Sequence, residues 1–180
     1  MKKFVSLLCV SLLVVCGVAG VVFADDAKWD HTKYLELAKD TMAKIIGGDM
    51  DGAISQLDTL TDIGVAGAKE HISEADTPDN EKKIMQEVID NHEQMGSMSV
   101  EDIEKEWHEG GHMKAKGVEI SSFDHYSEVM CHYDAVIHPI TAAICLKGYK
   151  KSSDKEMLEQ AKAEIEEVIQ HVEKLSKMGH

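Results

Sequence analysis

Apolar residues recur every three or four positions through most of this chain, the spacing that places them on one face of an α-helix. No segment shows the sustained alternation of apolar and polar residues that a half-buried strand requires. The pattern predicts helices over residues 30–46, 51–75, 77–96, 99–110, 122–149 and 153–175. We therefore expect an all-α fold, an antiparallel helical bundle with four long helices and one or two short ones.

Several predicted helix ends have sequence signals of their own. Thr77 followed by Pro78 predicts a helix start, because the hydroxyl can accept from the first turn and proline fits a position that needs no donor. Gly47 and Gly48 end the first helix. Capping-box spacing marks two further starts, at Ser99 with Asp102 and at Ser153 with Glu156.

Glycine and proline also occur inside predicted helices. Gly64 and Gly67 each weaken a helix by about 1 kcal/mol relative to alanine, so they indicate a bend or a close contact with another helix. Pro139 breaks the hydrogen-bond ladder and would kink or end its helix. In a continuous helix Cys131 and Cys145 would stand roughly 21 Å apart, far beyond the roughly 6 Å that a disulfide spans. Only a sharp hairpin at the proline would bring them together.

The predicted helix over 122–149 combines a broad apolar face with metal-binding residue types. His125, Glu128 and His132 follow each other at i, i+3 and i+7, so they form a stripe along the border of the apolar face. Imidazole and carboxylate groups are ligands that transition metals accept. This stripe predicts a metal site beside the core.

A second line of possible donors follows the same predicted helix. Cys131, His138 and Cys145 are spaced by seven residues, with Asp134 beside them. The alternative interpretation is structural, because boundary histidines and buried helical cysteines are common in cores. We interpret the remaining histidines as structural for this reason, namely His31, His71, His92, His171 and His180.

Residues 108–112 have the sequence HEGGH, which resembles the zincin motif, in which two histidines one helical turn apart hold zinc and Glu109 would activate water. Two successive glycines oppose a helix by about 2 kcal/mol where the motif needs one. Ala115 also occupies the position of a required glycine in the longer metzincin form of the motif, and no third histidine follows. A small zinc peptidase is therefore a secondary alternative.

The same glycines would let the chain turn so that His108 and His112 face His125 and His132 across a crevice. A Zn, Cu, Ni or Fe ion could bind there, and a b-type haem held by His125, His132 or His138 is an alternative. A covalently attached haem is excluded, because the sequence has no C-x-x-C-H. The metal ligands that we predict are His108, His112, His125, Glu128, Cys131 and His132.

The first 24 residues contain two lysines, a long apolar run and a small-x-small sequence at Val22–Ala24. These are the features of a cleaved secretory signal peptide, so we expect a single domain over 25–180 in a periplasmic or secreted protein. The formal net charge is −14, and the sequence contains no arginine. Such a chain is poorly suited to nucleic acid or anionic membranes and would attract cations.

The sequence thus predicts an exported helical bundle that binds a transition metal or haem, in a binding, storage or sensing role rather than a catalytic one. A metal-free interaction or stress protein is the alternative. The seam of Leu158, Ile165, Val172 and their neighbours serves either an intramolecular contact or a homodimer.

Overall fold

The computed structural model describes residues 29–178, and every regular element within this range is helical. The predicted signal peptide, residues 1–24, and His180 lie outside the described residues. An all-helical fold is thereby confirmed for the part of the chain that the structure describes.

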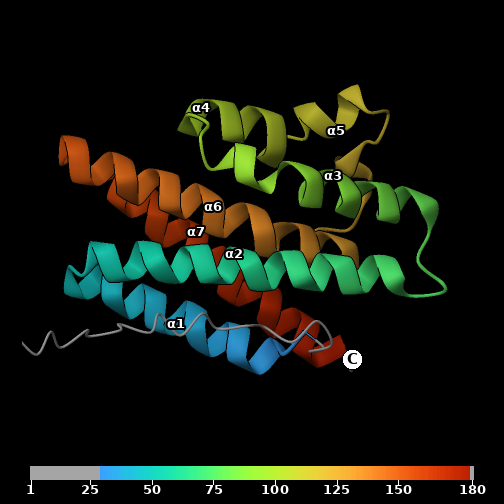
Figure 1. The fold of residues 1–180 in the computed structure, drawn as a ribbon, viewed down its shortest axis with the longest axis horizontal. Coiled ribbons are helices and arrows are strands. Elements are labelled where there is room, and N and C mark those ends of the chain that lie inside the picture. The colour runs from blue at the N-terminus through green and yellow to red at the C-terminus, as the bar shows by residue number, and fades with distance from the viewer. Residues whose placement is uncertain (1–28, 179–180) are drawn as a thin grey trace, which may run out of the picture.

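Four long helices form a closed antiparallel ring (Figure 1). Each packs against the next and the last packs against the first, so the ring encloses a continuous interior. Their bounds are α1 (His31–Gly47), α2 (Met50–Ser73), α6 (Glu128–Ser152) and α7 (Lys155–Met178).

A fifth long helix, α3 (Asp79–Met95), lies outside this ring against α2 and α6. A chain of short elements follows it and covers the same side of the bundle (Figure 1). They are α4 (Val100–Ile103), the π-helical turn η1 (Glu104–His108), α5 (Gly111–Ala115) and the 3-10 turn η2 (Ile120–Ser122). The helix predicted over 77–96 corresponds to α3, so the described residues contain five long helices where four were expected, and more short elements than the one or two expected.

Two of the predicted helix starts are wrong in detail. Thr77 does not cap α3, because its hydroxyl donates to the carbonyl of His71 instead (2.7 Å) and Pro78 precedes the helix. Ser153 ends α6 in a left-handed conformation (φ 59°), and the first turn of α7 is capped by Asp154, whose Oδ1 accepts from the N–H of Glu156. The predicted cap at Ser99 is confirmed, since its hydroxyl oxygen accepts from the N–H of Asp102 (3.1 Å).

The predicted start of the central helix at Ser122 is also wrong, because α6 begins at Glu128. Residues 123–127 form a turn, in which Asp124 Oδ1 accepts from the backbone N–H of Tyr126 (2.9 Å). A short polar side chain that bonds the backbone in this way competes with helix formation. His125 therefore precedes the helix and does not share a stripe with Glu128 and His132.

Pro139 neither ends α6 nor turns it into a hairpin, since the helix continues to Ser152. Proline supplies no N–H to the carbonyl of Ala135, and the hydroxyl of Tyr34 on α1 donates to that carbonyl instead (2.6 Å). A Cβ at Gly64 would collide with the same carbonyl, so this glycine allows the close contact between α2 and α6. The expected close helix contact is confirmed.

Of the described helices, α6 alone is long and apolar enough to cross a bilayer, and 94% of its most apolar window is buried by the surrounding helices. Its apolar character is therefore accounted for by its central place in the bundle. Cys131 and Cys145, both buried on this continuous helix, are free thiols.

Candidate metal sites

The central helix α6 presents two pairs of possible ligands to two different neighbours. Asp134 and His138, one helical turn apart, lie against α7, where they approach His171 and Glu164. Glu128 and His132, also one turn apart, lie close to His71 of α2. Because residues four apart share a helix face, each pair can act with a partner helix on one ion.

The pair facing α7 belongs to a buried group that we call the interior cluster: His108, Asp134, His138, Glu164 and His171. His138 Nδ1 pairs with Glu164 Oε2 at 2.7 Å, and His138 Nε2 lies 3.7 Å from Asp134 Oδ1. His108 enters from η1, with Nε2 at 2.9 Å from the hydroxyl oxygen of Thr141 and 3.8 Å from Glu164 Oε2. Imidazoles and carboxylates thus alternate through the interior.

The innermost member of this cluster is His171, which has no exposed surface. Its Nδ1 lies 3.2 Å from Asp134 Oδ2, yet neither atom makes a hydrogen bond within residues 29–178, and neither does His171 Nε2. Buried polar atoms nearly always have a partner, so atoms left in this way need an explanation. A tetrahedral ion with bonds of about 2.0 Å holds its ligand atoms roughly 3.3 Å apart, which agrees with this separation.

Burial shifts the protonation of the interior cluster toward neutral forms. It lowers the pKa of His138 to about 4 and that of His171 to about 3. Burial, reinforced by Glu167 and Glu164, raises the pKa of the Asp134 carboxyl well above its usual range. At neutral pH both imidazoles are therefore in the form that binds metal, whereas the raised pKa of Asp134 disfavours the charged carboxylate that a cation binds.

The interior cluster extends toward solvent through His125 and Glu167. The His125 ring packs edge-on against His171 with centroids 4.5 Å apart, and Glu167 Oε2 lies 3.8 Å from His171 Nε2. These three side chains bring their ligand atoms within 4.8 Å of one another. Because His125 is exposed, this end of the cluster is open to the surface.

The pair facing α2 forms a second group, the rim cluster: His71, Glu128 and His132. The two imidazole rings are 5.1 Å apart, and His71 Nδ1 lies 3.8 Å from Glu128 Oε1. The cluster borders a cavity of about 300 Å³ whose lining includes Trp29. Small molecules can therefore approach the rim cluster through this cavity.

The four histidines expected to converge lie in separate surroundings. His108 belongs to the interior cluster, His132 to the rim cluster, and His125 to the exposed end beside His171. His112 stacks on Trp107 with centroids 4.4 Å apart, and its Nε2 bonds Glu87 Oε2 at 2.9 Å. That contact ties α5 to α3, and the hydrogen bond from His112 lowers the pKa of Glu87.

The HEGGH sequence does not form the helix that the zincin motif needs. Gly110 is left-handed (φ 77°), and the chain breaks there between η1 and α5. His108 and His112 consequently point to different partners, Thr141 and Glu87. Glu109 is exposed on this break.

Cys131 is buried in α6 but belongs to none of the ligand groups among the described residues. Burial raises the pKa of its thiol to about 12, so the thiolate that metals bind is strongly disfavoured. The donors that do come together are nitrogen and oxygen atoms.

Four residues of these clusters were neither predicted ligands nor possible donors in the sequence: His71, Glu164, Glu167 and His171. Asp134 and His138 had been noted only as a second line of possible donors, with His138 also a possible haem ligand. The sequence contains a signal for Glu164 and His171, because they are seven residues apart beside the apolar seam of α7. Polar residues at such core-facing positions are rare unless they are paired. His71 has no comparable signal, since it lies near the end of α2 next to polar residues.

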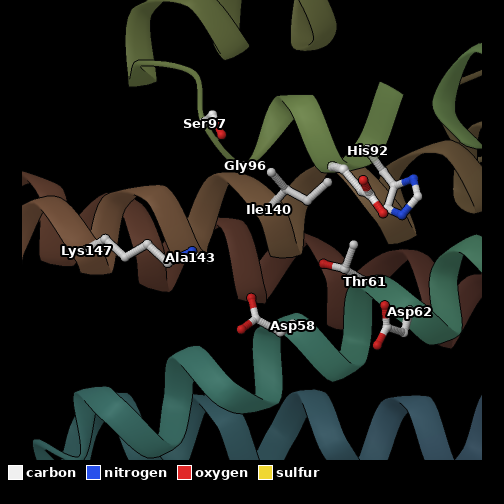
Figure 2. A pocket seen from close by; sticks show the side chains of 10 residues that line it. Asp58, Thr61, Asp62, His92, Gly96, Ser97, Ile140, Ala143 and Lys147 are labelled. Atoms are coloured by element: carbon white, nitrogen blue, oxygen red, sulfur yellow. The ribbon is translucent and has the colours of Figure 1, made fainter. Parts of the chain in front are cut away.

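Another cavity, of about 380 Å³, lies between α2, α3 and α6. Figure 2 shows Asp58 and Asp62 of α2 on one side of it and His92 of α3 on the other. His92 Nδ1 already bonds the carbonyl of Ile89 (2.7 Å), and both carboxylates are exposed. None of these residues belongs to a ligand group, so His92 provides a control histidine.

No known protein family, curated protein or solved structure matches this chain.

Proposed function

We propose that this protein binds one transition-metal ion between Asp134, His138 and His171, in the space between α6 and α7. The observation that carries the proposal is that His171 is fully buried and makes no hydrogen bond to any described residue through either ring nitrogen. Its Nδ1 lies 3.2 Å from the buried Oδ2 of Asp134. An ion bonded to His171 Nδ1 and Asp134 would satisfy both atoms. Glu164 would hold His138 in place through its other ring nitrogen, as outer partners of metal-bound histidines do.

The donor set narrows the class of metal. Two imidazoles and a carboxylate suit Zn, Cu, Ni or Fe, whereas Ca and Mg prefer oxygen ligands alone. The acidic character of the chain favours cation uptake. The signal-like first 24 residues support an exported, periplasmic or secreted protein, for which a binding, storage or sensing role is the simplest function.

Elemental analysis and calorimetric titration of the purified protein with Zn²⁺, Cu²⁺, Ni²⁺ and Fe²⁺ test this proposal. We expect tight binding that His171→Ala abolishes at the interior cluster and that His92→Ala leaves intact. An absorption spectrum recorded on the same preparation distinguishes haem from a bare ion. Unchanged binding in His171→Ala, or no uptake of any of these metals, would contradict the proposal and favour a metal-free interaction protein.

A further inference from the structure

The rim cluster, on the face of α6 toward α2, also contains a buried ring nitrogen that makes no hydrogen bond among the described residues. His71 is 4% exposed, and its Nδ1 makes no hydrogen bond within the described residues. That nitrogen faces Glu128 Oε1 at 3.8 Å, while the other ring nitrogen lies 3.1 Å from Glu81 Oε2. The ring is thus held at one edge by a carboxylate and presents its other edge to Glu128 and to Glu74, whose Oε2 lies 3.9 Å from Nδ1.

His132 completes the group from the next turn of α6. Its ring centroid is 5.1 Å from that of His71, with the two planes inclined by 30°. One ligand atom from each of His71, Glu128 and His132 lies within 4.8 Å of the other two. A tetrahedral ion needs its ligand atoms roughly 3.3 Å apart, so shifts of about 1 Å at the side-chain ends would form the site.

We propose that His71, Glu128 and His132 form a second, solvent-accessible binding site for a divalent transition metal. Two imidazoles and one carboxylate are the donor set of sites that keep a coordination position for water or a small ligand. The adjoining cavity of about 300 Å³ provides the space for such a ligand. The site is independent of the interior cluster, because the two groups share no residue.

The contact of Trp29 with this cluster provides a local reporter. Its ring packs edge-on against the ring of His132 with centroids 4.5 Å apart, and Trp29 lines the adjoining cavity. Cu²⁺ quenches tryptophan fluorescence at short range. Because Trp107 lies beside other histidines, the Trp107→Phe variant isolates the signal of Trp29.

The experiment titrates Cu²⁺ into the Trp107→Phe protein and follows fluorescence together with metal stoichiometry. We expect His71→Ala to remove one bound equivalent and most of the Trp29 quenching. Glu128→Gln, which preserves side-chain size, should weaken binding at this site at least tenfold. His92→Ala is the matched control and should change neither quantity, and far-UV circular dichroism verifies that each variant is folded.

Retention of the full stoichiometry and quenching in both His71→Ala and Glu128→Gln would overturn the proposal. The result is separable from the interior site. If the protein binds a single equivalent of Cu²⁺ that His171→Ala abolishes and His71→Ala does not affect, the rim-site proposal is wrong and the interior-site proposal stands. If His71→Ala abolishes that equivalent and His171→Ala has no effect, the interior-site proposal is wrong and the rim-site proposal stands.

Discussion

Asp134 is a buried acid whose place in the core is unfavourable without a cation. Burial raises its pKa, so the folded state holds the proton more tightly than the unfolded chain, and the stability linked to this proton is lost as pH rises above about 4. At neutral pH the residue therefore lowers the free energy of unfolding of the metal-free protein. A residue that opposes folding yet lies 3.2 Å from an unpaired imidazole is better explained by binding than by structure.

The variant Asp134→Asn tests this opposition between stability and binding. We expect the metal-free variant to melt a few degrees higher than the parent, because about 1 kcal/mol shifts the midpoint by roughly 2–4 °C in a domain of this size. The part of the rise in midpoint that metal binding at the interior cluster causes should disappear, since a neutral amide is a weak ligand. Thermal melts with and without Zn²⁺ measure both effects, and the exposed Asp58→Asn serves as control. A destabilised variant whose midpoint rises with Zn²⁺ as much as that of the parent would contradict this account.

The same carboxyl predicts how metal affinity depends on pH. With pKa values of about 4 and 3, His138 and His171 are already neutral above pH 5, so any proton that the ion displaces from these three ligands comes from Asp134, whose pKa is raised by burial. Below the raised pKa of Asp134, affinity should rise with pH by up to about tenfold per unit, and it should level off above that pKa. Calorimetry in two buffers of different ionisation enthalpy counts the released proton. A pH-independent affinity would show that Asp134 is not a ligand.

At the scale of the helix, Tyr34 supplies the hydrogen bond that Pro139 cannot. Its hydroxyl donates to the carbonyl of Ala135, although 101 residues separate the two. Tyr34→Phe leaves the carbonyl of Ala135 without a donor in the core, and we expect the free energy of unfolding to fall by about 1–3 kcal/mol. In a Pro139→Ala background the new N–H can bond that carbonyl within the helix, so the same substitution should have a smaller effect.

Urea denaturation of the four proteins of this double-mutant cycle measures the coupling between Tyr34 and Pro139. Tyr149→Phe, at a half-buried position of the same helix, controls for the general loss of a hydroxyl. An equal effect of Tyr34→Phe in both backgrounds would mean that the hydrogen bond does not compensate for proline.

The helices themselves were predictable because apolar spacing of three and four residues is a local property of the chain. Their ends were less so. At Asp124 and Thr77 a side chain bonds the backbone or a neighbouring carbonyl, and such bonds depend on the folded surroundings. The break at Gly110 was indicated by paired glycines, whereas the π-helical turn before it was not.

The residues of the candidate metal site were harder to predict from the sequence than the helices were. Asp134 and His138 are one turn apart, which the sequence reveals, but their alignment with His171 depends on how α6 and α7 pack against each other. One sequence carries no direct record of that register between helices. His125 was placed on the wrong element for a different reason, because the apolar pattern continues past the true start of α6.

At the scale of the whole molecule, α2 and α6 join two regions of core. One region contains Trp107 and the inner faces of α3 and the short elements, and the other contains the inner faces of α1 and α7, with Trp29 packed against it. Both regions include residues of α2 and α6. Since the same two helices supply apolar surface to both, neither region can unfold without exposing part of the other.

This shared core predicts a single cooperative unfolding transition. The variants Trp107→Phe and Trp29→Phe each leave one tryptophan, so fluorescence reports one region at a time. In each variant the fluorescence melt should coincide with the loss of helical circular dichroism. Because an ion held between α6 and α7 binds the folded state alone, a hundredfold excess over Kd adds about 2.7 kcal/mol and should raise both midpoints by roughly 5–10 °C. A midpoint that rises for Trp29 but not for Trp107 would show that the two regions unfold separately, with the metal stabilising only the ring of α1, α2, α6 and α7.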